Sequence, residues 1–146
     1  ICKRFENTGK HISPELAEEI CRLVDNHSSY VQQLSWLLWI RTINTATTEQ
    51  LTYALEDLLD QNNILFQSET ENLSAYQMNF LKAIVDGIHT KFSSKEVISK
   101  YNLGTSANIV RLKNALLQKE LIETNGKEIV LADPVFGVWF KKEMLY

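Results

Sequence analysis

The chain has 146 residues, 45% of them hydrophobic and 23% charged, with a formal net charge of −3 at pH 7. This composition is typical of a folded globular protein and excludes a collagen-like, disordered or disulfide-rich chain. The longest apolar cluster, residues 34–40, is too short to span a membrane, and the two cysteines, Cys2 and Cys21, favour a reducing, cytoplasmic setting.

The first half of the chain begins with two helical patterns. Ser13 and Pro14 predict a helix start, because Ser caps helices and Pro suits the first helical position. A second helix is expected over residues 30–43. Its middle is apolar nearly all round, so we expect it to be the central helix of this unit. Its Trp36 and Trp39 are expected in the core or at an interface rather than in a ligand site.

A third helix follows in the same half. Thr47 and Gln50 have the spacing of a capping box, in which each side chain bonds the backbone of the other. Leucines at helical spacing then carry the pattern to about Asp60. Residues 62–72 are expected to form a connector to the second half of the chain.

The second half begins with two helices and a tight turn. Ser74 and Gln77 form a capping box that starts the first helix, and Ser93 and Glu96 form another that starts the second. Gly104 then allows the positive φ that a sharp reversal needs.

A third helix and a hairpin come next. Thr105 or Ser106 caps the helix, and its apolar residues recur at helical spacing: Ile109, Leu112 and Leu116. Residues 121–124 and 128–131 flank Asn125-Gly126, which is a strong hairpin signal. Helix-turn-helix followed by a hairpin is the pattern of a winged helix, whose last helix can enter a DNA major groove.

The chain ends with a further helix. Asp133 and Pro134 predict its start, and the residues that follow are strongly apolar. We expect Phe136, Trp139 and Phe140 to pack on the winged helix or on a second copy of the chain. The predicted fold class is therefore mostly α: a three-helix bundle, then a winged helix-turn-helix with a small β-hairpin and a C-terminal helix.

Charge divides the chain in two. Residues 1–73 carry five Lys and Arg against eleven Asp and Glu, whereas residues 74–146 carry ten against seven. This asymmetry supports two units and assigns any polyanion partner to the second. The Cys and His residues match no metal-ligand spacing, and every Gly stands outside a phosphate-binding motif, so we expect neither a metal site nor catalysis by this chain alone.

The last helix of the helix-turn-helix carries a candidate DNA-reading set. Ser106, Asn108 and Arg111 face away from its apolar stripe. Asn108 and Arg111 are three positions apart, so both are expected to reach base edges. Lys113 and the hairpin residue Lys127 would contact phosphates. The alternative is an ordinary solvated helix face, because these residue types are common on surfaces.

The order of motifs also carries a resemblance. Its most specific parts are Ser-x-x-Gln-x3-Leu-Lys-Ala from Ser74 and Asp-Pro-Val-Phe from Asp133, with further matches at residues 5–13 and 30–34. Together they resemble the C-terminal part of the archaeal-type P-loop ATPases of the AAA+/STAND group, which also occur in bacteria. The resemblance covers nearly the whole chain.

The resemblance implies two subdomains with different roles. Residues 1–66 would be the helical lid subdomain of an ATPase module, and residues 73–146 a winged-helix domain with a C-terminal helix. The P-loop core, with ATP and Mg²⁺, would precede the chain, whose first residue is Ile and not Met. In that family a Gly-His-Pro-Tyr turn between lid helices lies against the adenine. Here Asn26 replaces the Gly and Ser the Pro, which leaves His27 and Tyr30 as the nucleotide contacts.

Two functions follow from these patterns. The first is a regulatory fragment of a P-loop ATPase, not catalytic alone, that couples nucleotide state to protein or DNA contacts. The alternative is a winged-helix DNA-binding transcriptional regulator. The surface around Asn108, Arg111 and Lys127 discriminates between them. An open and basic surface favours DNA, and a surface covered by the lid or by the last helix favours the ATPase switch.

Overall fold

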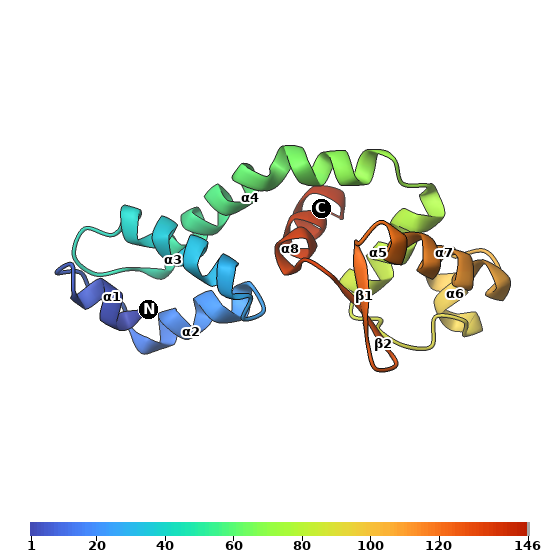
Figure 1. The fold of residues 1–146 in the computed structure, drawn as a ribbon, viewed down its shortest axis with the longest axis horizontal. Helices are drawn as coiled ribbons and strands as arrows, with labels where there is room; N and C mark the ends of the chain where they lie inside the picture. Colours follow the sequence, from blue (N-terminus) through green and yellow to red (C-terminus); the bar gives the residue numbers. More distant parts are fainter. Residues whose placement is uncertain (146) are drawn as a thin grey trace. The chain divides into compact units, whose positions relative to one another are not determined.

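The computed structural model describes residues 1–145, which fold mostly into helices with one two-stranded antiparallel sheet (Figure 1). The chain divides into two compact units, unit 1 (Ile1–Ile64) and unit 2, which starts at Leu65. Among residues 1–145, no helix combines the length and apolar character needed to cross a membrane.

Unit 1 contains helices α1 (Cys2–Glu6), α2 (Pro14–Leu23) and α3 (Ser28–Arg41), and the first part of α4 (Thr48–Glu71). The predicted start of α2 is confirmed, because Ser13 Oγ accepts a hydrogen bond from the Leu16 N–H at 3.1 Å. The capping box before α4 is confirmed as well: Thr47 and Gln50 bond each other's backbone N–H at 3.2 and 3.0 Å. The short α1 was not expected.

The expectation for α3 is only partly right. Leu34 and Leu38 are fully buried, but Trp36 and Ile40 are 57% and 55% exposed. The helix therefore has one buried side and one apolar side that faces solvent, and it is not surrounded by protein. An apolar sequence pattern cannot distinguish these two situations, because both give apolar residues all round the helix.

The expected connector over residues 62–72 is wrong, because α4 continues without interruption to Glu71. The sequence of α4 contains no Gly or Pro, the two residues that most strongly disfavour a helix interior. Asn62 does not end the helix, since its side-chain amide donates to the Leu58 carbonyl oxygen at 2.8 Å. The division between the two units falls inside α4, between Ile64 and Leu65.

Unit 2 has the predicted order of a winged helix. After the end of α4 come α5 (Ala75–Val85), α6 (Lys95–Tyr101), α7 (Ser106–Gln118), β1 (Ile122–Asn125), β2 (Glu128–Leu131) and α8 (Pro134–Met144). Helix α5 lies at the centre, in contact with α6, α7, β2 and α8. The reciprocal bonds of Ser74 and Gln77 start α5, as the sequence predicts.

The predicted start of α6 is wrong by one residue. Ser94, and not Ser93, is the N-cap, and its hydroxyl accepts from the Val97 N–H at 3.3 Å. Adjacent serines both have the chemistry of a cap, so the sequence alone does not choose between them. The preceding Phe92 is buried and stacks on Phe80 of α5, with ring centroids 4.5 Å apart.

Helix α8 packs on the rest of unit 2 through three buried rings, those of Phe136, Trp139 and Phe140. The Phe66 ring of α4 lies 5.4 Å from Phe136 and 5.6 Å from Trp139 between centroids. Of the two alternatives, packing on the winged helix or on a second copy, the structure therefore has the first. A partner of unit 2 would have to contact other residues than these rings.

Candidate nucleic-acid interface

The turn between α6 and α7 is built from two residues with positive φ. Asn102 caps α6 at φ 53°, and Gly104 has φ +87°, as the sequence predicts for this Gly. The Thr105 hydroxyl then caps α7 by accepting from the Asn108 N–H at 3.3 Å. From α5, the Asn79 amide donates to the Asn102 carbonyl at 3.2 Å and ties the turn to the centre of the unit.

Asn108 does not lie where the DNA-reading hypothesis puts it. Its side chain is half-buried, and its Nδ2 donates to the Leu103 carbonyl oxygen at 2.9 Å. A Cβ on Gly104 would lie only 3.1 Å from that same Nδ2. The amide of Asn108 thus stabilises the turn. The Asn108 side chain does not share an exposed face with Arg111.

The exposed side of α7 is defined by five residues, which we call the outer face of α7. They recur at helical spacing, opposite the buried Ile109, Leu112 and Leu116: Ala107, Val110, Arg111, Asn114 and Gln118. Sequence reasoning missed Asn114 and Gln118 as candidates. The signal was available, because the three buried positions fix the opposite side of the helix. Ser106 is exposed at the first turn, and Lys113 is half-buried.

The hairpin forms a short wing. Strands β1 and β2 pair antiparallel, with Asn125 opposite Glu128, so Gly126 and Lys127 make the turn. Gly126 has φ +64°, and the Lys127 side chain is exposed at the tip. One pair from its tip the hairpin is fixed to His89, whose carbonyl accepts from the Ile129 N–H at 2.8 Å. The His89 Nδ1 donates to the Ile129 carbonyl at 3.0 Å.

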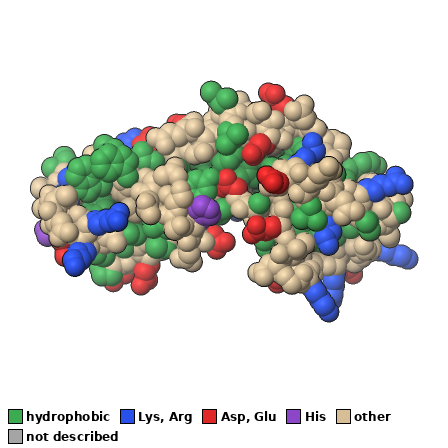
Figure 2. Space-filling model, in the orientation of Figure 1, with side chains coloured by type: hydrophobic (Ala, Val, Ile, Leu, Met, Phe, Trp, Pro, Cys, Tyr) green, Lys and Arg blue, Asp and Glu red, His purple; other side chains and the backbone are tan. Residues whose placement is uncertain are grey.

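The Lys and Arg side chains of unit 2 can contact an anionic partner. Within residues 65–145, no Lys or Arg side chain forms an ion pair; the two pairs found among the described residues, Arg22–Glu19 and Arg41–Asp57, belong to unit 1. Figure 2 shows Lys and Arg side chains spread over α6, α7 and the tip of the hairpin.

The pKa of one tyrosine beside this surface is shifted. The Tyr101 hydroxyl at the end of α6 donates to Asp86 Oδ2 at 2.9 Å. Partial burial and this hydrogen bond both favour the neutral phenol, so the pKa of Tyr101 is raised above its ordinary value. The bond joins the C-terminal ends of α5 and α6 and so helps to fix the platform on which α7 lies.

The expected nucleotide contacts lie in unit 1. His27 is the N-cap of α3, and its ring lies 4.9 Å from that of Tyr30 between centroids, at a tilt of 46°. The two preceding residues, Asp25 and Asn26, have positive φ of 50° and 57° and end α2. Across residues 1–145, no three His, Cys, Asp or Glu side chains gather as a metal site would need.

Comparison with known proteins bears on unit 2. No curated protein and no solved structure matches the chain. A family model described as a probable winged helix domain matches residues 64–142, which is more than half of the sequence. The matched segment contains all of α5 to β2 and most of α8. On that match and on its own order of elements, the chain belongs to the family of probable winged helix domains.

Proposed function

We propose that unit 2 binds duplex DNA, with α7 in the major groove and the hairpin against the backbone as a wing. The observation that carries this proposal is the open, unpaired state of Arg111 and Lys127. Both side chains are exposed, and neither has an ion-pair partner among residues 1–145. The aromatic residues of α8 are buried, and Phe136 and Trp139 lie beside Phe66 of α4.

The outer face of α7 supplies the base contacts. Arg111 can donate two hydrogen bonds to guanine O6 and N7, and Asn114, one turn further along, can bond adenine in the same bidentate way. Val110, 60% exposed on the same face, is suited to a thymine methyl group. Ser106 at the start of the helix, together with Lys113 and Lys127, contacts phosphates. Asn108 acts indirectly, by holding the turn that aims α7.

The expected affinity is low. Few cations reach the duplex, and unit 1 adds negative charge, with five Lys and Arg against nine Asp and Glu in residues 1–64. We therefore expect mostly non-specific binding with a Kd of about 10⁻⁵ M or weaker, and a strong decrease in affinity with salt.

A titration of labelled duplex DNA tests this proposal. The native chain, Arg111→Ala and Lys141→Ala are compared at about 50 mM and about 200 mM salt. Lys141 is the control, because it is exposed on α8, outside the helix-turn-helix and wing, and its loss changes the net charge equally. Arg111→Ala should weaken binding at least about fivefold, and more than Lys141→Ala does, because Arg111 lies on the outer face of α7 that enters the groove. Equal effects of the two substitutions, or no binding at the lower salt, would contradict the proposal.

A second candidate function concerns unit 1. The rings of His27 and Tyr30, 4.9 Å apart between centroids, are the residues that the resemblance to the AAA+/STAND ATPases assigns to adenine contact. In this reading the chain is a regulatory lid and winged helix, which couples ATP and Mg²⁺ held by a P-loop core in the parent protein to contacts with DNA or a protein partner. The test is the upstream gene sequence. A GxxxxGK[ST] motif after a strand pattern supports it, and an upstream sequence without one overturns it.

A further inference from the structure

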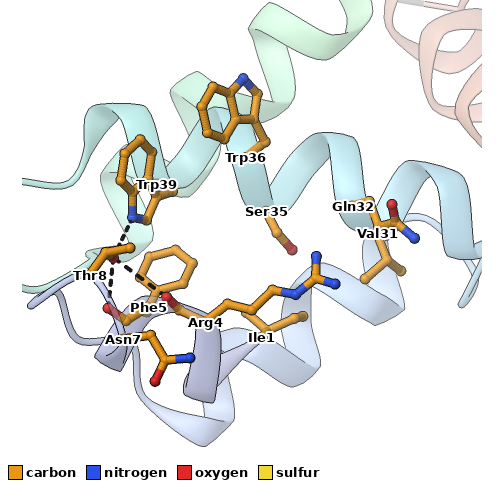
Figure 3. A pocket seen from close by; sticks show the side chains of 10 residues that line it. All are labelled: Ile1, Arg4, Phe5, Asn7, Thr8, Val31, Gln32, Ser35, Trp36 and Trp39. Carbon is orange, nitrogen blue, oxygen red and sulfur yellow. Dashed lines mark hydrogen bonds between the residues drawn. The ribbon is translucent and has the colours of Figure 1, made fainter.

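Unit 1 has a groove of about 690 Å³ between α1 and α3. Figure 3 shows its lining, with Phe5 and Arg4 from α1 on one side and Val31, Ser35, Trp36 and Trp39 from α3 on the other. This volume is that of a site for a small organic molecule. The groove includes neither His27 nor Tyr30, and it belongs to the unit that the DNA proposal does not use.

One wall of the groove is a fixed aromatic surface. Trp36 stacks on Trp39, with ring centroids 5.1 Å apart and planes within 13°. Trp39 is held from two sides, because its Nε1 donates to Thr8 Oγ1 at 2.8 Å and Lys10 Nζ lies 3.9 Å from its ring centroid. Lys10 Nζ also donates to the Trp39 carbonyl at 2.8 Å. Trp36 therefore rests on a rigid support while remaining 57% exposed.

The lining has one charged side chain, and that side chain is positive. Arg4 is the charged side chain of the groove, it is exposed, and it forms no ion pair with residues 1–145. Beside it, the shielded Ser35 hydroxyl oxygen has no hydrogen-bond partner, and its side chain turns toward the groove (Figure 3). A lone guanidinium without a carboxylate stands out in a unit where acidic residues outnumber basic ones.

We propose that this groove binds a small organic acid with an apolar body. The carboxylate pairs with the Arg4 guanidinium, which can bond both carboxylate oxygens. The apolar body covers Trp36 and removes its exposed ring from water. An organic cation of the same shape is disfavoured, because it would meet Arg4 without a counter-charge.

The test uses two probes with the same number of carbon atoms and opposite charge: 4-phenylbutyrate and 4-phenylbutylamine. Each is titrated into the ¹⁵N-labelled chain, and the indole Nε1–H signals of the three Trp residues are followed by NMR. The acid should shift the Trp36 and Trp39 signals with a Kd of roughly 1 mM, as a fragment of this size allows. Trp139, buried in unit 2, serves as the internal reference and should not move.

Variants of α1 decide whether Arg4 is responsible. Arg4→Gln should weaken binding of the acid about fivefold to tenfold, in line with the loss of a charge-assisted hydrogen bond. Lys3→Gln removes the same charge from the neighbouring exposed position, outside the groove, and should leave the affinity within about twofold. An unchanged spectrum for the other residues shows that each variant is folded. Equal binding of acid and amine, equal effects of the two variants, or no saturable shift would each overturn the proposal.

Discussion

Two apolar residues of α3, two positions apart, have opposite surroundings. Leu38 is completely buried, and Ile40 is 55% exposed. A helix turns by about 100° per residue, so positions two apart point to nearly opposite sides. Replacing Leu38 therefore leaves a cavity inside unit 1, whereas replacing Ile40 removes atoms that water already surrounds.

This difference predicts the stability of two single variants. Leu38→Ala should lower the free energy of unfolding of unit 1 by about 2–5 kcal/mol. Ile40→Ala, on the same helix, should change it by about 0.5 kcal/mol or less. Urea unfolding followed by the fluorescence of Trp36 and Trp39 measures both. Losses of similar size would mean that the two sides of α3 are equally buried in solution.

Single residues also show how far the sequence could be interpreted. Caps were predicted where one capping residue stands alone, as at Ser13, and missed by one position where Ser93 and Ser94 compete. Asn108 shows a second limit. Its amide bonds a carbonyl five residues earlier, across a turn whose geometry is set by packing against α5. Periodicity identifies the buried side of a helix, but it does not reveal which polar side chains bond their own backbone.

At the scale of elements, the prediction was least accurate for α4, whereas the start of α8 was predicted correctly. The sequence offered Asp133 and Pro134 as a start for α8, and both have those roles: Asp133 Oδ1 accepts from the N–H groups of Val135 and Phe136. Its apolar residues meet Phe66, which lies in the part of α4 expected to be a connector. The longer α4 thus provides part of the surface that buries α8.

Removal of α8 should therefore expose apolar surface within unit 2. A chain that ends at Ala132 loses the three buried rings of α8 and leaves Phe66 without its aromatic neighbours. We expect it to aggregate and to bind a hydrophobic dye, because large uncovered apolar patches associate.

Size-exclusion chromatography and dye fluorescence measure this effect. The matched control is a chain that ends at Lys142, which shortens α8 but retains all three rings. It should remain soluble. If the chain ending at Ala132 is equally soluble and stable, α8 does not complete the core of unit 2.

At the scale of the whole molecule, the alternation of caps, apolar periods and turn signals was sufficient to predict a mostly helical fold with a winged helix in its second half. The same periods identified the buried side of α7, but Asn114 and Gln118 on its exposed side were not chosen from them. The groove of unit 1 could not be predicted. The groove depends on α1, which at five residues is too short to show a helical sequence pattern. It also depends on the contact of α1 with α3, which is distant in the sequence.

The charge of the whole chain makes a final prediction about DNA. The cations of the helix-turn-helix and wing lie in unit 2, while unit 1 is acidic, so the two units act oppositely on a polyanion. Three exposed carboxylates of unit 1 can be neutralised without loss of an ion pair: Glu18→Gln, Glu56→Gln and Asp60→Asn. Glu56 and Asp60 are also four apart on α4, where like charges repel each other, so their loss should not destabilise the helix.

The triple variant should bind duplex DNA about twofold to fivefold more tightly than the native chain at low salt, because less negative charge opposes association. At about 200 mM salt the difference should nearly disappear, since the Debye length falls below about 8 Å. The same labelled-duplex titration measures both values, and Arg111→Ala added to the triple variant should reverse the gain. If the gain persists at high salt, the substitutions act through structure and not through charge. If there is no gain at low salt, the acidic unit does not limit DNA binding.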